Sequence, residues 1–371
     1  MIRINPFDTF CSSFDMDVDK NRICELIQVA LGTRKQLTVV PSALEWSAIY
    51  RELEKHAVLG VMLMGVEKLP ETQRPPKEIL LSWIGIGEII RRHNKLVDKR
   101  CLQLIKSLKD ANLRYCILKG QGNAMMYPNP YCRNAGDNDV WLEGGKKNVV
   151  EYVHGIYPNI NVQYHHMEFP VFDDIEVEVH YFPSFCYNKF HNRRLQKYFR
   201  DNSDKQFEHL VKWNDSDEMV CVPTLTFNLV FQLSHMMRHF FTQGIGLRHA
   251  IDYYYLLSQN ITDSEKQEAV RVMKRCGMYK FLCAIMWIEK EIFGLRANLD
   301  IAPENEEVGK MVLQEMMIGG NFGKKHGHNK GGILSVYSKQ MLYRLKFIME
   351  FPSEPLWRPV ALVWNYIKKR V

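Results

Sequence analysis

The sequence predicts an α+β protein, in which a small mixed-sheet core lies between an N-terminal and a C-terminal helical region. Two observations predict this class. Apolar residues recur at helical spacing up to about residue 110 and again after Pro223. Between these segments, short β-prone runs alternate apolar and polar residues as strands do. We therefore expect a helical region at residues 1–110, an α/β core at 111–200 and a second helical region at 201–371.

The composition is that of an ordinary globular protein, with 46% hydrophobic and 25% charged residues in a chain of 371. Its nine cysteines are scattered and form no C-x-x-C pair, which argues against a disulfide framework and a zinc ribbon. The N-terminal residues form no apolar signal core, and no apolar run is long and uncharged enough to span a bilayer. We expect a cytoplasmic protein without a membrane span, and the oligomeric state stays open.

The N-terminal region contains two long helical patterns. Residues 43–70 carry apolar side chains at helical spacing, and Pro70 followed by Pro75 and Pro76 marks a break. A second pattern covers residues 77–110, and Asn112 is a plausible stop signal. The first hundred or so residues are therefore expected to be mainly helical.

The core begins where the period of the pattern changes. Residues 114–118 predict a strand, 120–127 a short helix or turn, 128–136 a loop, 137–143 a second strand and 144–157 a helix. Residues 161–182 contain two alternating runs that meet at Asp173 and Asp174, which predicts a β-hairpin with these acids in its turn.

The C-terminal region returns to helical patterns at residues 224–241, 247–259, 263–277, 281–294 and 305–318. A glycine- and lysine-rich loop at 319–332 then precedes two last helical pieces. After Gly320 there are ten Lys and Arg against two acidic residues, Glu350 and Glu354. Such a segment can attract nucleic acid or other anions, but a solvated surface is the favoured interpretation, and the net charge of +7 does not by itself indicate nucleic acid.

An acidic pair opens the second strand of the core. Asp137 and Asp139 are two residues apart, so both side chains point to the same side of a strand. Two like charges side by side are unfavourable unless a cation lies between them or water solvates both. The pattern alone leaves these two explanations open.

The second strand of the hairpin supports the first explanation. Glu176, Glu178 and His180 share one of its faces, and such a polar face does not belong to a core. If this strand lies beside the one that starts at Asp137, then Asp137, Asp139 and Glu178 converge on a pocket suited to Mg²⁺. His180 would be a partner of a carboxylate or simply a strand histidine with its hydrogen bonds satisfied.

These motifs resemble a family of bacterial nucleotidyltransferase-like proteins within the polymerase-beta-like nucleotidyltransferase superfamily. The resemblance is strongest between Arg114 and Tyr181 and extends more loosely into the flanking helices. It is carried by Leu118-Lys119-Gly120, Tyr127-Pro128-Asn129-Pro130, Arg133, Gly136-Asp137-Asn138-Asp139, and Glu178 with His180.

The resemblance implies a polymerase-beta-like core and metal-dependent transfer of a nucleoside monophosphate from an NTP to a hydroxyl acceptor that the sequence does not identify. Asp137 and Asp139 would hold one or two Mg²⁺ ions, and Glu178 would complete the metal site and orient or deprotonate the acceptor hydroxyl. Gly120 would let the backbone approach the triphosphate. The implied cofactor-binding set is Lys119, Gly120, Arg133, Gly136 and His180.

The sequence departs from the superfamily pattern at one point. Better-known members carry a Gly-Ser pair where this chain has Lys-Gly-Gln-Gly-Asn, so Asn123 or backbone N–H groups would have to hold the terminal phosphate. The alternative function is therefore a catalytically inactive nucleotide-binding or interaction module of the same fold. Lys119 and Arg133 are candidate phosphate contacts, the alternatives being a solvated lysine and an arginine paired with an acid.

Two further histidines, His235 and His239, stand four residues apart on a predicted helix. This spacing suits a metal site, but the glutamate that a zinc protease requires after the first histidine is missing. Helix packing near the cleft is the favoured interpretation.

Overall fold

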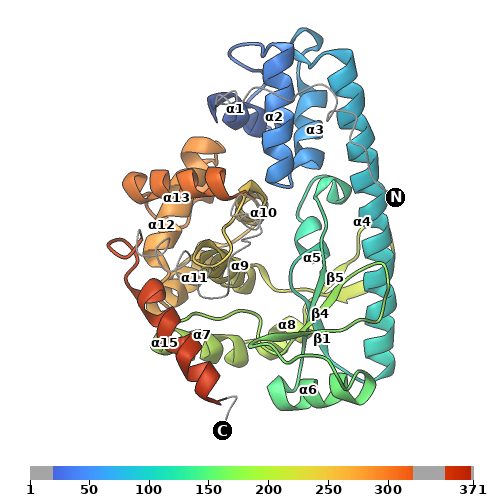
Figure 1. Cartoon of the computed structure of the whole chain (residues 1–371), viewed down its shortest axis with the longest axis vertical. Coiled ribbons are helices and arrows are strands. Elements are labelled where there is room, and N and C mark those ends of the chain that lie inside the picture. The colour runs from blue at the N-terminus through green and yellow to red at the C-terminus, as the bar shows by residue number, and fades with distance from the viewer. Residues whose placement is uncertain (1–19, 321–346, 369–371) are drawn as a thin grey trace.

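The computed structural model describes residues 20–320 and 347–368, and it confirms the α+β class (Figure 1). The helices of this part of the chain are α1 (Lys20–Leu31), α2 (Ala43–Lys55), α3 (Leu59–Lys68), α4 (Lys77–Asp110), α5 (Gln121–Ala124), α6 (Gly145–Ile156), α7 (Lys189–Asp201), α8 (Ser203–Glu208), α9 (Leu225–Phe240), α10 (Leu247–Leu257), α11 (Asp263–Arg275), α12 (Tyr279–Trp287), α13 (Glu306–Gly319) and α15 (Ser353–Lys368). The strands are β1 (Tyr115–Ile117), β2 (Asn138–Leu142), β3 (His166–Glu168), β4 (Val177–His180), β5 (Leu210–Lys212) and β6 (Met219–Cys221).

The first long helical pattern forms two helices rather than one. α2 begins at a capping box, in which Ser42 and Glu45 satisfy each other's backbone N–H groups. The chain then turns at Ala57, whose φ of 54° is left-handed, and α3 begins two residues later. Because alanine has no strong propensity to leave a helix, the pattern of residues 43–70 gave no signal for this break.

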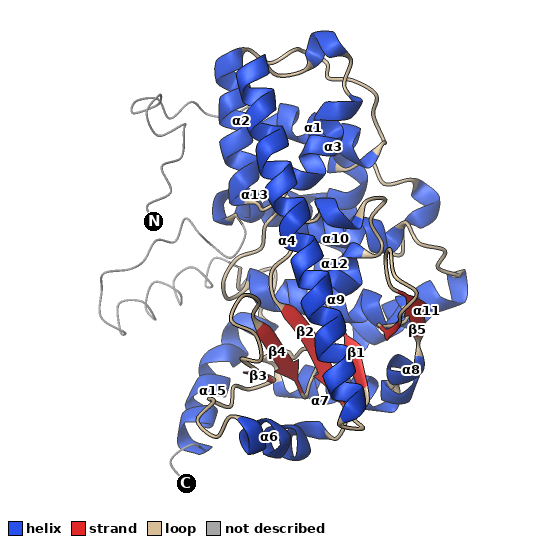
Figure 2. Cartoon of the chain, turned by 90° about the vertical axis from the view of Figure 1, so that its right-hand side faces the viewer, coloured by secondary structure: helices blue, strands red, loops and turns tan. Residues whose placement is uncertain are grey.

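The second pattern is confirmed in full, since α4 covers Lys77–Asp110. It ends where Asn112 takes a left-handed φ of 54°, a conformation that asparagine tolerates better than most residues. Figure 1 shows that α4 runs from the N-terminal helices down to the sheet, and Figure 2 shows its lower half crossing the strands. This single helix thus connects the N-terminal region to the core.

The core sheet has the strand order β1-β2-β4-β3 and mixes both pairings. β2 is antiparallel to β1 and parallel to β4, and β4 is antiparallel to β3, as the predicted hairpin requires. In the parallel pair, Asp139 lies opposite Glu178. The sheet therefore brings the two predicted acidic positions into direct register.

The two faces of the sheet differ in character. One face carries Val140, Val177 and Val179, which pack in one hydrophobic cluster with the C-terminal half of α4 and with α6. The other face carries Trp141, which stacks against Phe227 of α9, together with the polar side chains of the acidic positions. This alternation follows from the period of two along a strand. It directs the acids toward the C-terminal helices.

The C-terminal region is less purely helical than predicted. α9, α10, α11 and α13 lie where the patterns placed them, and the pattern at 281–294 forms α12 followed by a π turn at Ile288–Ile292. Before them, residues 183–223, for which no individual element was predicted, contain α7, α8 and the antiparallel hairpin of β5 and β6, and this hairpin lies in the region that was expected to be helical. The limits of the three predicted regions, at residues 110 and 200, stay a prediction.

The cysteines and the longest helices bear on two further sequence expectations. All eight cysteines that the structure describes are free thiols. Within the described ranges, none of the helices combines the length and the apolar character that crossing a membrane requires. The glycine- and lysine-rich loop and most of the basic C-terminal segment lie outside the described residues, so their interpretation stays open.

A matched pair of glycines tests the packing between the N-terminal helices and the core. We expect Gly60→Ala to destabilise the protein by about 1–3 kcal/mol, because a Cβ atom there would lie 2.2 Å from the backbone carbonyl oxygen of Cys132. Gly85 is also helical, but a Cβ atom there meets nothing within 4 Å. Gly85→Ala should therefore raise stability by about 0.5–1 kcal/mol through helix propensity. Urea unfolding followed by tryptophan fluorescence measures both changes, and equal effects would contradict the packing described.

Candidate functional site

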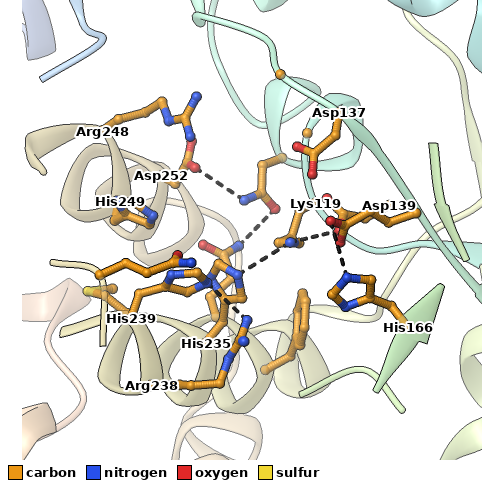
Figure 3. A pocket seen from close by; sticks show the side chains of 18 of the residues that line it. Lys119, Asp137, Asp139, His166, His235, Arg238, His239, Arg248, His249 and Asp252 are labelled. Atoms are coloured by element: carbon orange, nitrogen blue, oxygen red, sulfur yellow. Dashed lines mark hydrogen bonds and ion pairs between the residues drawn. The ribbon is translucent and has the colours of Figure 1, made fainter. Parts of the chain in front are cut away.

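A cavity of about 530 Å³ lies between the polar face of the sheet and helices α9 and α10 (Figure 3). Its lining includes most of the predicted site residues. These are Lys119, Gly120, Arg133, Gly136, Asp137, Asp139 and Glu178. The cavity thus gathers segments that are far apart in the sequence around one space.

The floor of the cavity is a compact acidic and imidazole cluster. Asp139, Glu178 and His180 each offer a ligand atom, and these atoms all lie within 4.8 Å of one another. Nε2 of His180 is 2.7 Å from Oδ1 of Asp139 and 3.3 Å from Oε2 of Glu178. His180 is 1% exposed and does not line the cavity, so it supports the two carboxylates from behind. Of its two sequence-based interpretations, the structure shows the partner of a carboxylate.

Asp137 lies at the wall of the cavity rather than in the cluster on its floor. It precedes β2, lines the cavity and is half-buried, but it is not part of the tight cluster of ligand atoms formed by the described residues. Figure 3 shows Asp137 and Asp139 on the same side of the chain, as the alternation of a strand requires. The structure therefore brings Asp139 and Glu178 together closely and leaves Asp137 at the cavity wall.

Lys119 forms an ion pair with Asp139, one of the predicted metal ligands. Its Nζ lies 2.7 Å from Oδ1 of Asp139 and donates to Nε2 of His235 at 3.3 Å. Burial would lower the pKa of Lys119, but the charges of Asp139, Asp137 and Glu178 outweigh it and raise the pKa. The lysine is therefore charged and supplies the positive charge on the cavity floor.

The same contacts hold the acids in their ionised form. Burial alone would raise the pKa of Asp139, yet the charge of Lys119 and the hydrogen bond from His180 bring it below the ordinary value. For Glu178, burial is likewise outweighed, mainly by the hydrogen bond and charge of His180, and the pKa falls to about 2. Burial would lower the pKa of His180, but the hydrogen bonds from its ring to Asp139 and Glu178 raise it. Both carboxylates are thus deprotonated at neutral pH.

Glycine is required at the first turn after β1. Gly120 has a φ of 57°, and a Cβ atom there would lie 2.9 Å from the backbone oxygen of Asp137. A side chain would strain this approach of the two segments. At Gly136, by contrast, a Cβ atom meets nothing within 4 Å. Whether either glycine approaches a phosphate stays a prediction.

Arg133 belongs to a buried network that the sequence did not reveal. Its Nε and Nη2 donate to the two carboxylate oxygens of Asp252 on α10, at 2.8 and 2.9 Å. Tyr127 donates to the same carboxylate at 2.5 Å. The alternative that Arg133 pairs with an acid is therefore the one observed. The acid lies 119 residues away in the chain.

Asn123, the residue proposed to replace the missing serine, also joins this network. Its amide nitrogen donates to Asp252 at 3.4 Å, and its oxygen accepts from Gln232 at 3.0 Å. Both ends of the side chain are therefore engaged within the protein. A phosphate at this helix start would have to meet backbone N–H groups or residues from elsewhere.

The wall opposite the acids is cationic and rich in histidine. Arg238 and His239 come from α9, while Arg248 and His249 come from α10, and all four line the cavity with His235 (Figure 3). Nη2 of Arg238 donates to Nε2 of His239 at 2.9 Å.

Sequence reasoning missed the two arginines of this wall and Asp252. Each arginine is followed by a histidine, but the same Arg-His dipeptide also occurs at residues 92–93, so this local pattern does not distinguish them. The prediction that His235 and His239 pack near the cleft is consistent with their places in the cavity lining.

Comparison with known proteins finds a matching family model and similar solved structures. Residues 42–294 match the model of a family described as uncharacterised nucleotidyltransferase. Among solved structures, the chain is similar to an antigenic nucleotidyltransferase-like protein from Paracoccidioides brasiliensis, with 12% identity and a TM-score of 0.33 over 58% of this chain and 95% of that chain. The curated proteins contain no match.

The family match confirms the nucleotidyltransferase part of the resemblance. The bacterial family and the polymerase-beta-like superfamily stay predictions. Because the matched residues cover more than half of the chain and include the whole core, the chain belongs to the family of uncharacterised nucleotidyltransferases.

Proposed function

We propose that the protein is a metal-dependent nucleotidyltransferase, which moves a nucleoside monophosphate from an NTP to a hydroxyl acceptor and releases pyrophosphate. The observation that carries this proposal is the register of β2 and β4, which sets Asp139 beside Glu178 on the floor of the cavity. Family membership supports nucleotidyl transfer as the reaction. The identity of the acceptor is left open.

The donor set fits Mg²⁺ by its chemistry. Asp137, Asp139 and Glu178 offer carboxylate oxygens, which Mg²⁺ prefers, and the last two have lowered pKa values that keep them deprotonated. These three residues would hold the ion. Mg²⁺ at such a site would neutralise charge that develops on the phosphates and activate the attacking hydroxyl.

The balance of charges around the cavity supports the proposal that the nucleotide binds together with a cation. Four cationic side chains and four carboxylates line it, so their formal charges cancel. The cationic residues are Lys119, Arg133, Arg238 and Arg248, and the acidic residues are Asp137, Asp139, Glu178 and Asp252. A triphosphate alone would bring an uncompensated negative charge into a partly enclosed space, which is costly. A nucleotide that arrives with Mg²⁺ brings less net negative charge and so lowers this cost.

Other residues of the cavity would bind the phosphates and position the acceptor and the carboxylates. Arg238 and Arg248 face the acids from the helical wall and would hold phosphate oxygens, because the predicted contacts Lys119 and Arg133 already pair with acids. Glu178 would orient the acceptor hydroxyl or deprotonate it. His180 would keep Glu178 and Asp139 in place through its two contacts.

Arg238→Met tests the phosphate contact. We expect the dissociation constant of Mg²⁺–NTP to rise about 10- to 100-fold, because a charge-assisted hydrogen bond contributes about 1.5–3 kcal/mol. Methionine keeps the apolar volume that packs over Phe185. Arg271→Met removes an exposed arginine that does not line the cavity and should leave the constant unchanged. Calorimetry with each of the four NTPs gives the constants, and equal affinity of the two variants would contradict the phosphate contact.

The reaction itself is tested with labelled NTPs and a panel of acceptors, including sugar phosphates, small alcohols, protein hydroxyls and RNA ends. The wild-type protein should transfer label only when Mg²⁺ is present. The double variant Asp137→Ala/Asp139→Ala should transfer none. Identical transfer by both proteins would reject the proposed function.

A second candidate is a nucleotide-binding or interaction module without turnover. It is favoured by the ion pair of Lys119 with Asp139, which already neutralises the acid, and by the missing Gly-Ser pair. Calorimetry separates the two candidates. Mg²⁺-dependent NTP binding without pyrophosphate release from any acceptor would support the inactive module.

A further inference from the structure

A cluster of three histidines adjoins the carboxylates, and two of its members, His165 and His166, have no role in the proposed reaction. His166 on β3 lies opposite His180 on β4, and His165 directly precedes β3. The exposed fractions of the three residues are 5% for His165, 7% for His166 and 1% for His180. Burial of polar groups such as these three imidazole rings is costly unless each ring has a hydrogen-bonding partner or binds a metal ion.

The rings are close enough to share an ion. One ligand nitrogen from each ring lies within 4.8 Å of the other two. Nδ1 of His166 lies 3.3 Å from Nδ1 and 3.2 Å from Nε2 of His165. Two nitrogen ligands of a tetrahedral Zn²⁺, with bonds of about 2.0–2.1 Å, lie roughly 3.4 Å apart. The spacing of this pair therefore already suits a metal.

The polar surroundings of the cluster also suit a metal site. Among the described residues, the ring of His165 has no hydrogen-bonding partner except His166. Nδ1 of His180 is buried and has no partner in the same part of the chain. On the other side, Nε2 of His166 is 3.4 Å from Oε1 of Glu178, and such a carboxylate commonly orients a metal-bound histidine.

We propose that His165, His166 and His180 form a nitrogen-donor site for a divalent transition-metal ion, with Zn²⁺ as its best occupant. Imidazole nitrogens suit Zn²⁺ and its neighbours in the transition series, whereas Mg²⁺ prefers oxygen ligands. The site is separate from the carboxylate pair but shares His180 with it. His165 and His166 line the cavity, so a bound ion would have access to a fourth ligand from solvent or substrate. The proposal does not depend on nucleotidyl transfer.

The test uses the full chain without a polyhistidine tag, stripped of metal and titrated with Co²⁺ and then with competing Zn²⁺. The visible absorption of nitrogen-bound Co²⁺ should rise to one ion per chain, and Zn²⁺ should abolish it while an equal concentration of Mg²⁺ does not. His165→Gln should weaken Zn²⁺ binding at least about 100-fold, because loss of an outer partner alone costs about 10- to 100-fold. His166→Gln gives the same test if the first variant does not fold, as judged by circular dichroism.

His239→Gln is the matched control, since it removes a histidine from the opposite wall of the same cavity. It should bind Zn²⁺ as the wild type does. Equal loss in this variant, wild-type protein that prefers Mg²⁺, or full Zn²⁺ binding by His165→Gln would each overturn the proposal. The readout requires no nucleotide. Zn²⁺ binding without transfer therefore rejects the proposed function alone, whereas transfer without Zn²⁺ binding rejects this site alone.

Discussion

Glu178→Gln is expected to lower the rate of nucleotidyl transfer on the order of 10³-fold. The substitution keeps the shape of the side chain but removes the charge that lies in register with Asp139. A metal site and a proton acceptor together contribute several kcal/mol to the stability of the transition state, and each 1.36 kcal/mol is a factor of ten in rate. The rate of label transfer to the acceptor identified in the activity experiment measures the change. Glu178 is 27% exposed, so the variant should still fold.

Glu176→Gln is the matched control for this prediction. Glu176 carries the same charge two residues earlier, but it is exposed and does not line the cavity. Its removal should leave the rate unchanged. Similar losses in both variants would mean that general charge, rather than the position beside Asp139, matters for the reaction. Normal activity of Glu178→Gln would remove Glu178 from the proposed mechanism.

Asp252→Asn is expected to lower the free energy of unfolding by about 3–5 kcal/mol, because it leaves the buried guanidinium of Arg133 without its counter-charge. Burial would raise the pKa of Asp252, but the charge and hydrogen bonds of Arg133 bring it below the ordinary value. Its stabilising effect is therefore fully present above the ordinary pKa of an aspartate and is lost as the pH falls through the lowered one. Urea unfolding of both proteins at neutral and acidic pH measures the loss of unfolding free energy and the direction in which it changes with pH.

The control is an aspartate in a similar pair at the surface. Arg100 donates to Asp174 at 2.7 and 2.9 Å, but Asp174 is 37% exposed. Asp174→Asn should change stability far less, since water and salt screen an exposed pair. The double variant Arg133→Met/Asp252→Met should recover most of the loss, because removing both charges leaves none buried alone. If Asp174→Asn were as damaging as Asp252→Asn, burial would not explain the effect.

The parts of the structure that follow from local pattern could be predicted from the sequence. α4 has both ends marked, by Pro76 and by Asn112, and its apolar residues repeat over the whole length. The face shared by Glu178 and His180 follows from the period of a strand alone. The break at Ala57 could not be predicted in this way, because neither glycine nor proline marks it.

The helical wall of the cavity could not be predicted for a different reason. Arg238 and Asp252 reach the site through the packing of α9 and α10 against the core, and no local pattern encodes such contacts. A buried arginine and a buried aspartate look in the sequence like any other surface charges. Which acid neutralises Arg133 is decided by the fold, over a separation of 119 residues.

The parallel pairing of β2 with β4 places the acidic residues on the sheet, whereas the residues that shape the rest of the cavity lie on helices. The spacing of the backbones at Asp139 and Glu178 is set by main-chain hydrogen bonds between neighbouring strands, at about 4.8 Å, whatever side chains the helices place around them. The helices that face these acids contribute side chains but no backbone to this arrangement. Substitutions on α9 and α10 can consequently remodel what the cavity admits while the chemistry of its floor persists, which makes this scaffold a ready starting point for redesigning substrate choice.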